Sequence, residues 1–218
     1  MIERLVPDSV VVVSTRDDVF DVDLFPEEQP AVARAVEKRR REFTTGRACA
    51  RQALKRLGVE PVAIPNGERG EPLWPDGIAG SITHCNGYRA CAVARTENVA
   101  SLGVDAEPHE PLPDGVLEHV AFGAERAMVA DRGAGVCLDR LLFCAKEAVY
   151  KAWFPLARRW LGFEDAELTI DVAGEAFRAR LLVPGPAVNG TPLTELHGLW
   201  RVDDGIVAAA AVIPLAGG

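Results

Sequence analysis

Two patterns of apolar and polar positions alternate along the chain and predict a mixed α/β protein. Short runs of β-branched and small apolar residues are typical of buried strands, whereas apolar residues that recur every three or four positions indicate helices. Strands are expected at 9–15, 89–95 and 99–107, with two hairpins, 168–172 with 176–183 and 199–202 with 206–213. Helical patterns cover 31–57, 116–130 and 138–160.

The first helical segment is expected as one helix or as two helices that meet near Thr44-Thr45-Gly46. Its apolar stripe is formed by Ala50, Leu54 and Leu57, and Gly58 fits the position after a helix C-terminus. The segment 96–98 is expected as a hairpin turn that returns the strand 89–95 into the strand 99–107.

The order of elements predicts two similar α/β halves, 1–108 and 109–218. Each half runs from helix to hairpin, and the sequence of 87–94 faintly resembles that of 205–212. Ligand clefts often form where two such units meet, so an active site is expected at the junction.

Composition is consistent with this organisation and predicts a soluble, cytoplasmic protein. The chain has 218 residues, of which 48% are hydrophobic, enough for one large domain or two small ones. No apolar run reaches the ~18 residues of a membrane span, and the N-terminus lacks a signal-peptide pattern. The five cysteines contain no CxxC pair, which favours reduced, buried thiols over disulfides or a zinc site.

Charge is unevenly distributed. The formal net charge is −8, which argues against general nucleic-acid binding. The segment 34–56, however, holds nine basic residues against two acidic ones. Such a local excess predicts contact with a small polyanion or an acidic partner, with a solvated helix face as the alternative.

Candidate metal chemistry lies at the end of the strand 99–107. Asp105 and Glu107 are separated by one residue, so on an extended strand their side chains share a face, roughly 6–7 Å apart along the backbone at ~3.3 Å per residue. Two such carboxylates repel each other unless a cation such as Mg²⁺ neutralises them. The alternative is a solvated acidic turn before Pro108.

A second candidate lies on the helix 138–160. Glu147 and Lys151 are four residues apart and share a helical face, which could supply a further carboxylate and a cation. An ordinary surface ion pair is the alternative. His84, among hydroxyl and small residues in Ser81-Ile82-Thr83-His84, is either a ligand-binding or a structural histidine, and the Pro- and Gly-rich segment 61–80 is expected as a long, irregular loop.

Four ordered motifs carry a family resemblance. They are Arg39-Arg40-Arg41-Glu42-Phe43 through Arg47, Ser81-Ile82-Thr83-His84, Gly103-Val104-Asp105-Ala106-Glu107 and Phe143-Cys144-Ala145-Lys146-Glu147-Ala148-Val149-Tyr150-Lys151-Ala152. Together they resemble the Sfp-type 4′-phosphopantetheinyl transferases, especially the actinobacterial branch. The resemblance implies a cytoplasmic, monomeric α/β (α+β) enzyme whose two halves are related by a pseudo-twofold axis. It also implies transfer of phosphopantetheine from coenzyme A to a serine of acyl or peptidyl carrier proteins, with release of 3′,5′-ADP, in polyketide, nonribosomal peptide or siderophore biosynthesis.

The resemblance also implies roles for individual residues. Catalysis is assigned to Glu147, Lys151 and His84. Mg²⁺, or Mn²⁺ in its place, would be bound by Asp105, Ala106, Glu107 and Glu147, with Ala106 offering only its backbone carbonyl. Coenzyme A would be bound by Arg39, Arg47, Asn66, Gly67, Glu68, Arg69, Thr83, His84, Asp105, Tyr150, Lys151 and Trp160.

The sequence departs from the family pattern at two positions. Asn66 stands where this branch often has a basic residue, and Gly70-Glu71-Pro72 stands where many members have Gly-Lys-Pro, so two phosphate contacts are in question. The main alternative is a catalytically inactive coenzyme A or nucleotide-binding protein of the same fold, and a weaker one is a Mg²⁺-dependent phosphohydrolase. The complete set of carboxylates, together with Lys151, favours the transferase because a binding protein needs no base.

Overall fold

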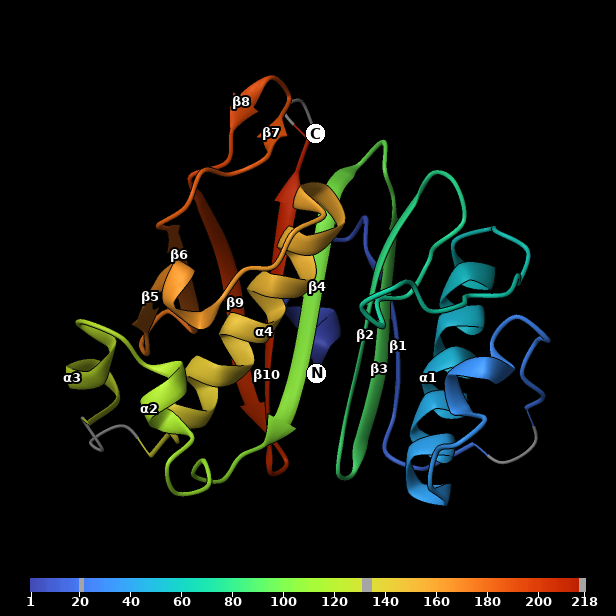
Figure 1. The fold of residues 1–218 in the computed structure, drawn as a ribbon, viewed down its shortest axis with the longest axis horizontal. Coiled ribbons are helices and arrows are strands. Elements are labelled where there is room, and N and C mark those ends of the chain that lie inside the picture. Colours follow the sequence, from blue (N-terminus) through green and yellow to red (C-terminus); the bar gives the residue numbers. More distant parts are fainter. Residues whose placement is uncertain (20–21, 131–134, 216–218) are drawn as a thin grey trace.

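The computed structural model describes residues 1–19, 22–130 and 135–215, and places two antiparallel sheets side by side (Figure 1). The smaller sheet has three strands in the order β1–β3–β2, formed by Val11–Thr15, Tyr88–Arg95 and Ile78–Cys85. Helix α1, Glu37–Arg56, covers one face of this sheet. Cys49, Ala50 and Leu54 of α1 pack against strand residues such as Val13 and Val93.

The larger sheet has five strands in the order β4–β10–β9–β6–β5. These strands are Val99–Pro108, Ile206–Pro214, Glu195–Asp203, Ala176–Leu181 and Ala166–Asp171. Helix α4, Leu138–Ala157, lies across one face of the sheet (Figure 1). Each sheet is thus covered by one 20-residue helix, and β4, which precedes residue 109, belongs to the larger sheet.

Short elements complete the fold. They are η1 (Ile2–Arg4), η2 (Gln29–Val32), α2 (Leu117–Val120), α3 (Glu125–Ala130), η3 (Phe163–Asp165), β7 (Ala187–Val188) and β8 (Thr191–Pro192). The helix expected over 116–130 is interrupted between α2 and α3. At the interruption, Phe122 N–H donates to the buried Glu125 carboxylate, which also accepts from Lys146 Nζ and Leu168 N–H. None of the described helices is long and apolar enough to cross a membrane.

The first helical segment forms one helix, α1, so the alternative of two helices meeting near Thr44-Thr45-Gly46 is wrong. Thr45 and Gly46 are buried, and a Cβ at Gly46 would lie 3.1 Å from Ile82 Cγ2 of β2, so a residue without a side chain fits where the helix packs on the sheet. The helix ends as expected, because Gly58 adopts a φ of 76° and Val59 N–H donates to Leu54 O over 2.9 Å.

Strand β4 does not form the expected hairpin with β3. It pairs with β10 instead, with Asp105 opposite Ala209 and Glu107 opposite Val207. The small residues of β10 explain this exchange, because they let the strand be buried on both faces. Val207, Ala209 and Ala211 face the core under α4, whereas Ala208 and Ala210 face the core of the N-terminal half.

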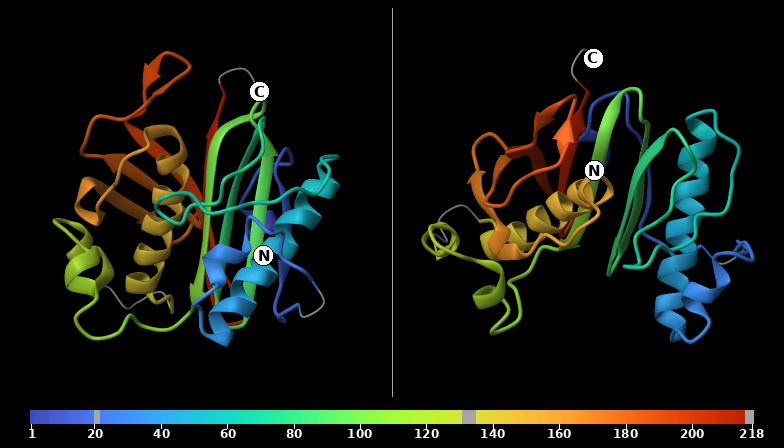
Figure 2. Two further views of the ribbon diagram at one scale, coloured as in Figure 1. Left: turned by 45° about the vertical axis from the view of Figure 1, so that its right-hand side comes forward. Right: turned by 45° about the horizontal axis from the view of Figure 1, so that its top comes forward.

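The two sheets meet at a seam between β2 and β4, which lie next to each other near the centre of the molecule (Figure 2). Side-chain hydroxyls bridge this seam in place of a backbone ladder. Val104 N–H donates to Ser81 Oγ and Ala106 N–H donates to Thr83 Oγ1, each over 3.0 Å. Strand β4 connects the two sheets, because it pairs with β10 and also contacts β2. The domain boundary at residue 108 stays a prediction.

Candidate active site

Close contact between β4 and α4 brings the two central motifs together. A Cβ at Gly103 would lie 2.0 Å from Ala148 O and 2.5 Å from Ala152 N. Only glycine therefore permits this approach of helix and strand. Because Gly103 and Asp105 share a face of β4, the same approach sets Asp105 beneath the second half of α4.

Asp105 is buried and forms an ion pair across this contact. Lys151 Nζ donates to Asp105 Oδ1 over 2.7 Å and to Val104 O over 3.2 Å, and Thr83 Oγ1 donates to the same Oδ1 over 3.1 Å. Burial alone would lower the pKa of Lys151, but the charge and hydrogen bond of Asp105 outweigh it and raise that pKa. The solvated acidic turn is thereby excluded, since Asp105 is 5% exposed.

The surface ion pair expected as the alternative for α4 is also absent. Within the described residues Lys151 pairs with Asp105 rather than with Glu147. Glu147 is half-buried, and its pKa is raised by burial and by the negative charge of Asp105, with Lys151 partly opposing the shift. A carboxylate in this environment binds a proton more readily than an exposed one.

Glu147 and Tyr150 line two cavities on either side of α4. The larger has a volume of about 470 Å³, and its walls include Arg69, Ser81 and Lys151. The smaller has a volume of about 270 Å³ and is lined mostly by apolar and aromatic side chains, among them Trp160. The Tyr150 and Trp160 ring centroids lie 4.9 Å apart, although Trp160 itself is 61% exposed.

Glu107 points its carboxylate toward the start of α4, where Arg140 Nη1 donates to Oε2 over 3.0 Å. Burial and the nearby charge of Asp105 raise the pKa of Glu107, and Arg140 opposes this effect. The two carboxylates of the motif therefore have different partners, Lys151 for Asp105 and Arg140 for Glu107.

Arg39 of α1 meets His84 of β2 on the N-terminal side of the seam. Its guanidinium contacts His84 Nε2, and Glu42 Oε2 lies 3.5 Å from His84 Nδ1. Burial and the positive charge of Arg39 lower the pKa of His84 from 6.5, while Glu42 opposes the shift. His84 is therefore neutral at pH 7. The charge of Lys151 contributes to the same shift, so these basic groups form one electrostatic cluster.

Arg47 lies deeper and holds the irregular loop. It is 4% exposed, and its guanidinium donates to Ile64 O over 2.7 Å and to Asn66 Oδ1 over 2.6 Å. Burial lowers the pKa of Arg47 to about 10, with Glu28 opposing, so the group stays protonated at neutral pH. Arg47 and Asn66 are thus brought together, but by a contact within the protein.

The loop closes on itself beside the larger cavity. Gly67 N–H donates to Glu71 O over 2.7 Å, and Arg69 N–H donates to the Glu71 carboxylate over 3.0 Å. The same carboxylate lies 3.8 Å from Arg158 Nη1, just after α4. Glu71 therefore shapes the loop, while Arg69 lines the cavity and Glu68 is exposed.

The carboxylates of Asp105, Glu107 and Glu147 meet some of the requirements for binding a hard divalent cation. Asp105 Oδ2 is buried without a hydrogen-bond partner among the described residues, and a cation would satisfy such an atom. No group of three or more His, Cys, Asp or Glu side chains is arranged as a metal site in the described parts of the chain. Mg²⁺ does not require such a group, because it usually binds one or two carboxylates together with water and substrate phosphates.

Ser81, Glu42 and Arg140 lie at the site but have no role among the sequence-based predictions. Ser81 and Glu42 lie beside predicted residues, two positions before Thr83 and three after Arg39, and these spacings are the signals that could have identified them. Arg140 has no such signal, because its partner Glu107 is 33 positions away in the sequence. Lys146, next to Glu147, instead forms a buried ion pair with Glu125 over 2.8 Å.

The fold and site define a protein of two α/β halves that gathers basic side chains and carboxylates at the seam between them. Family models match both halves: the 4′-phosphopantetheinyl transferase N-terminal domain over residues 27–94 and the 4′-phosphopantetheinyl transferase superfamily over residues 101–192. The chain belongs to the 4′-phosphopantetheinyl transferase superfamily. The expected fold class, family and enzyme class are thereby confirmed.

Relatives from actinobacteria agree with this assignment. The chain is 53% identical to 4′-phosphopantetheinyl transferase PptT of Mycobacterium tuberculosis over 193 residues, covering 86% of this chain and 85% of the relative. It is 48% identical to 4′-phosphopantetheinyl transferase Npt of Nocardia iowensis over 218 residues, covering 96% and 98%. It is 53% identical to 4′-phosphopantetheinyl transferase Svp of Streptomyces mobaraensis over 193 residues, covering 87% and 78%.

Proposed function

We propose that this enzyme transfers the phosphopantetheine arm of coenzyme A to a serine hydroxyl of acyl or peptidyl carrier proteins, with 3′,5′-ADP as the second product. The observation that carries the proposal is the cluster formed by Asp105, Lys151 and Glu147 beside two cavities. In this reaction the serine oxygen bonds to the phosphorus that carries pantetheine, and the bond from that phosphorus to the ADP oxygen breaks. Such a reaction depends mainly on positioning and charge neutralisation.

Basic residues on both sides of the seam would bind the phosphates of coenzyme A. Arg39 is exposed and can turn from His84 toward a 3′-phosphate, and a guanidinium contacts phosphate bidentately. Neutral His84 would add a hydrogen bond. The buried Thr83 hydroxyl donates to Asp105 and accepts from Ala106 N–H, so Thr83 would act by holding Asp105 rather than by touching coenzyme A. Arg47 would act mainly by holding Asn66 and the loop 66–69, which brings Arg69 to the cavity.

The smaller cavity would receive the pantetheine arm. Its walls are largely apolar, and Tyr150 and Trp160 stand at one side in contact with each other. Because the Trp160 ring is exposed, the smaller cavity would open to the surface beside it. A carrier protein would approach the cavity from this side. Both cavities share Glu147, so the reacting phosphorus would lie near this carboxylate.

Glu147 would accept the serine proton, directly or through a water molecule. Its raised pKa makes it a better base than an exposed glutamate, and it lies one helical turn from Lys151. Lys151 would neutralise negative charge on the departing ADP. Its ion pair with Asp105 holds the ammonium group in position before substrate binds.

Asp105, Glu107 and Glu147 would hold Mg²⁺, or Mn²⁺ in its place, with the Ala106 carbonyl as the remaining candidate ligand. The unpartnered Asp105 Oδ2 supports this assignment. When bound, the ion supplies positive charge that neutralises the pyrophosphate oxygens. We further propose that the enzyme acts as a monomer, since both halves of the site come from one chain.

The experiment is intact-mass analysis of an apo carrier protein after incubation with coenzyme A, Mg²⁺ and the enzyme. The expected result is a mass gain of one phosphopantetheine group, abolished by replacing the carrier serine with alanine and by chelating the metal. Carriers from polyketide, peptide and siderophore systems are tested in parallel. Unchanged mass in every carrier would refute the proposal and favour a protein that only binds coenzyme A.

A further inference from the structure

Arg140 is buried in the first turn of α4, at the opposite end of the helix from Arg158. It is 9% exposed, and each of its three guanidinium nitrogens donates one hydrogen bond. Nη1 donates to Glu107 Oε2 over 3.0 Å, Nε donates to Glu110 O over 3.0 Å and Nη2 donates to Pro111 O over 2.9 Å. A planar guanidinium held at three points has little rotational freedom.

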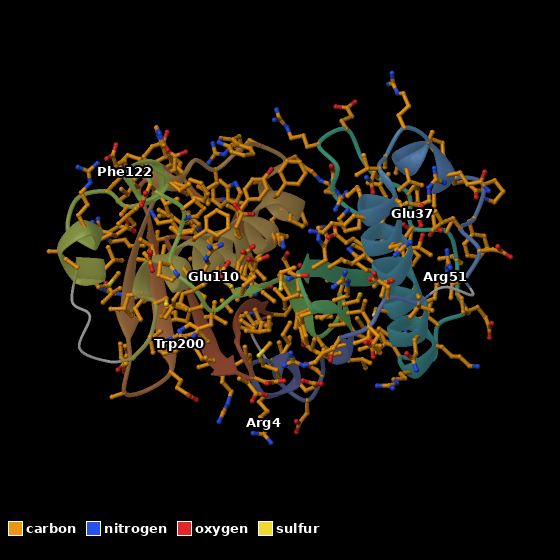
Figure 3. All side chains as sticks on the ribbon, turned by 90° about the horizontal axis from the view of Figure 1, so that it is seen from below. Arg4, Glu37, Arg51, Glu110, Phe122 and Trp200 are labelled. Carbon is orange, nitrogen blue, oxygen red and sulfur yellow. The ribbon has the colours of Figure 1, made fainter. Side chains whose placement is uncertain are left out.

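Two further hydrogen bonds hold the ends of the connection between β4 and α4, called the crossover below, near residues 109–112 and 137–139. Leu112 N–H donates to Asp139 Oδ2 over 2.9 Å, and Cys137 N–H donates to His109 Nε2 over 3.0 Å. Figure 3, seen from below, shows Glu110 of this crossover between the side of the molecule with Glu37 and the side with Phe122. The start of α4 and the end of β4 are therefore tied together independently of the Lys151 ion pair.

We propose that Arg140 is a positioning residue that orients the Glu107 carboxylate for the divalent cation. The inference rests on the proposed function, because it takes Glu107 as a metal-binding residue. Arg140 occupies Oε2, and Oε1 accepts no hydrogen bond from the described residues, so one oxygen is held and the other is available. A glutamate side chain otherwise has several rotamers and loses conformational entropy when a ligand fixes it.

The geometry distinguishes this role from that of an ordinary ion pair. Arg140 is bound to backbone carbonyls on two of its nitrogens, so its position does not depend on Glu107. Residues that orient metal ligands in this way typically contribute ten- to hundredfold to metal affinity or activity. A positive charge without an orienting role would instead weaken cation binding through repulsion.

The test measures Mn²⁺ binding to the full-length enzyme by electron paramagnetic resonance in the presence of coenzyme A, together with turnover as a function of Mg²⁺ concentration. Four variants are compared: Arg140→Gln, Arg140→Lys, Glu107→Gln and Asp139→Ala. Asp139→Ala is the matched control, because it removes the hydrogen bonds that Leu112 N–H and Arg140 N–H donate to the Asp139 carboxylate but keeps the contact between the Arg140 guanidinium and Glu107. Melting temperatures establish that each variant is folded.

Arg140→Gln is expected to bind Mn²⁺ ten- to hundredfold more weakly, with turnover partly recovered at high Mg²⁺, and Arg140→Lys is expected to be intermediate. Asp139→Ala is expected to stay within threefold of the wild-type affinity while losing thermal stability. If Glu107→Gln weakens Mn²⁺ binding and Arg140→Gln does not, the positioning role is refuted while the metal site stands. If Glu107→Gln itself binds Mn²⁺ normally, the metal assignment in the proposed function fails instead.

Discussion

Lys151 Nζ lies 2.7 Å from Asp105 Oδ1, so one ion pair joins α4 to β4 directly beside the seam between the two sheets. Asp105 is almost fully buried, and its second oxygen, Oδ2, has no hydrogen-bond partner among the described residues. Lys151 therefore holds one oxygen of this buried carboxylate, while the other stays without a partner in the described parts of the chain.

Replacing Lys151 with methionine should lower both activity and stability. The buried Asp105 carboxylate would lose its charged partner, which costs about 1–3 kcal/mol in the free energy of unfolding. Turnover should fall at least a hundredfold at saturating coenzyme A, the lower range for loss of a catalytic charge or proton carrier. Thermal melts and turnover of a carrier protein measure the two effects.

The double variant with Asp105→Asn separates these contributions. Removing both charges should recover much of the lost stability, because no charge is left buried alone, while activity stays low. Equal stability of the single and double variants would contradict the structural role, and near-normal turnover in either would contradict the catalytic one.

Glu147→Gln should fold normally and lose at least a hundredfold in kcat, since glutamine keeps the shape but accepts no proton. The affinity of the variant for Mg²⁺ should also fall, because the metal loses a charged ligand. Wild-type turnover would mean that Glu147 lies on an ordinary helix face.

The raised pKa of Glu147 predicts a pH-dependent difference in stability. A carboxyl whose pKa is raised by folding contributes stability below its ordinary value of 4.5 and loses that contribution as pH rises through the folded pKa. Glu147→Gln lacks this loss, so its melting temperature relative to wild type should increase from about pH 4 to pH 7. A constant difference across this range would show that the carboxylate is not desolvated.

Arg39 and Arg47 should behave differently when each is replaced by alanine. Arg39 is exposed, so its loss should raise the KM for coenzyme A roughly ten- to hundredfold with little change in melting temperature. Arg47 is buried and holds Ile64 and Asn66, so its loss should also destabilise the protein. Dephospho-coenzyme A, which lacks the 3′-phosphate, is the control: a wild-type enzyme that uses both substrates equally would exclude a 3′-phosphate contact for either arginine.

Gly103→Ala should disrupt the approach of α4 to β4. The added Cβ would overlap Ala148 O and Ala152 N, and such overpacking costs about 1–3 kcal/mol or more. We expect a lower melting temperature and lower turnover, because the Lys151–Asp105 contact depends on this approach. Gly190→Ala is the control. Gly190 lies at the β7–β8 turn, where an added Cβ meets no atom within 4 Å but the φ of 77° strains an alanine, so this variant should lower the melting temperature and keep full turnover.

Local patterns of the sequence determine much of the fold. The period of apolar residues located α1 and α4, and the turn residues before Gly205 located the β9–β10 hairpin, because these features arise from neighbours in the sequence. The spacing of Asp105 and Glu107 likewise placed both carboxylates on one face of a strand. The ordered motifs, taken together, resembled one family closely enough to predict the enzyme class.

Only the tertiary structure decided which of these groups interact. Lys151 is four residues from Glu147 but pairs with Asp105, because Gly103 lets the helix descend onto the strand. Pairing of β4 with β10 rather than β3, and the contact of Arg140 with Glu107, join segments 33 or more positions apart. Such partners are chosen by packing and burial across the whole chain, and no local spacing records them.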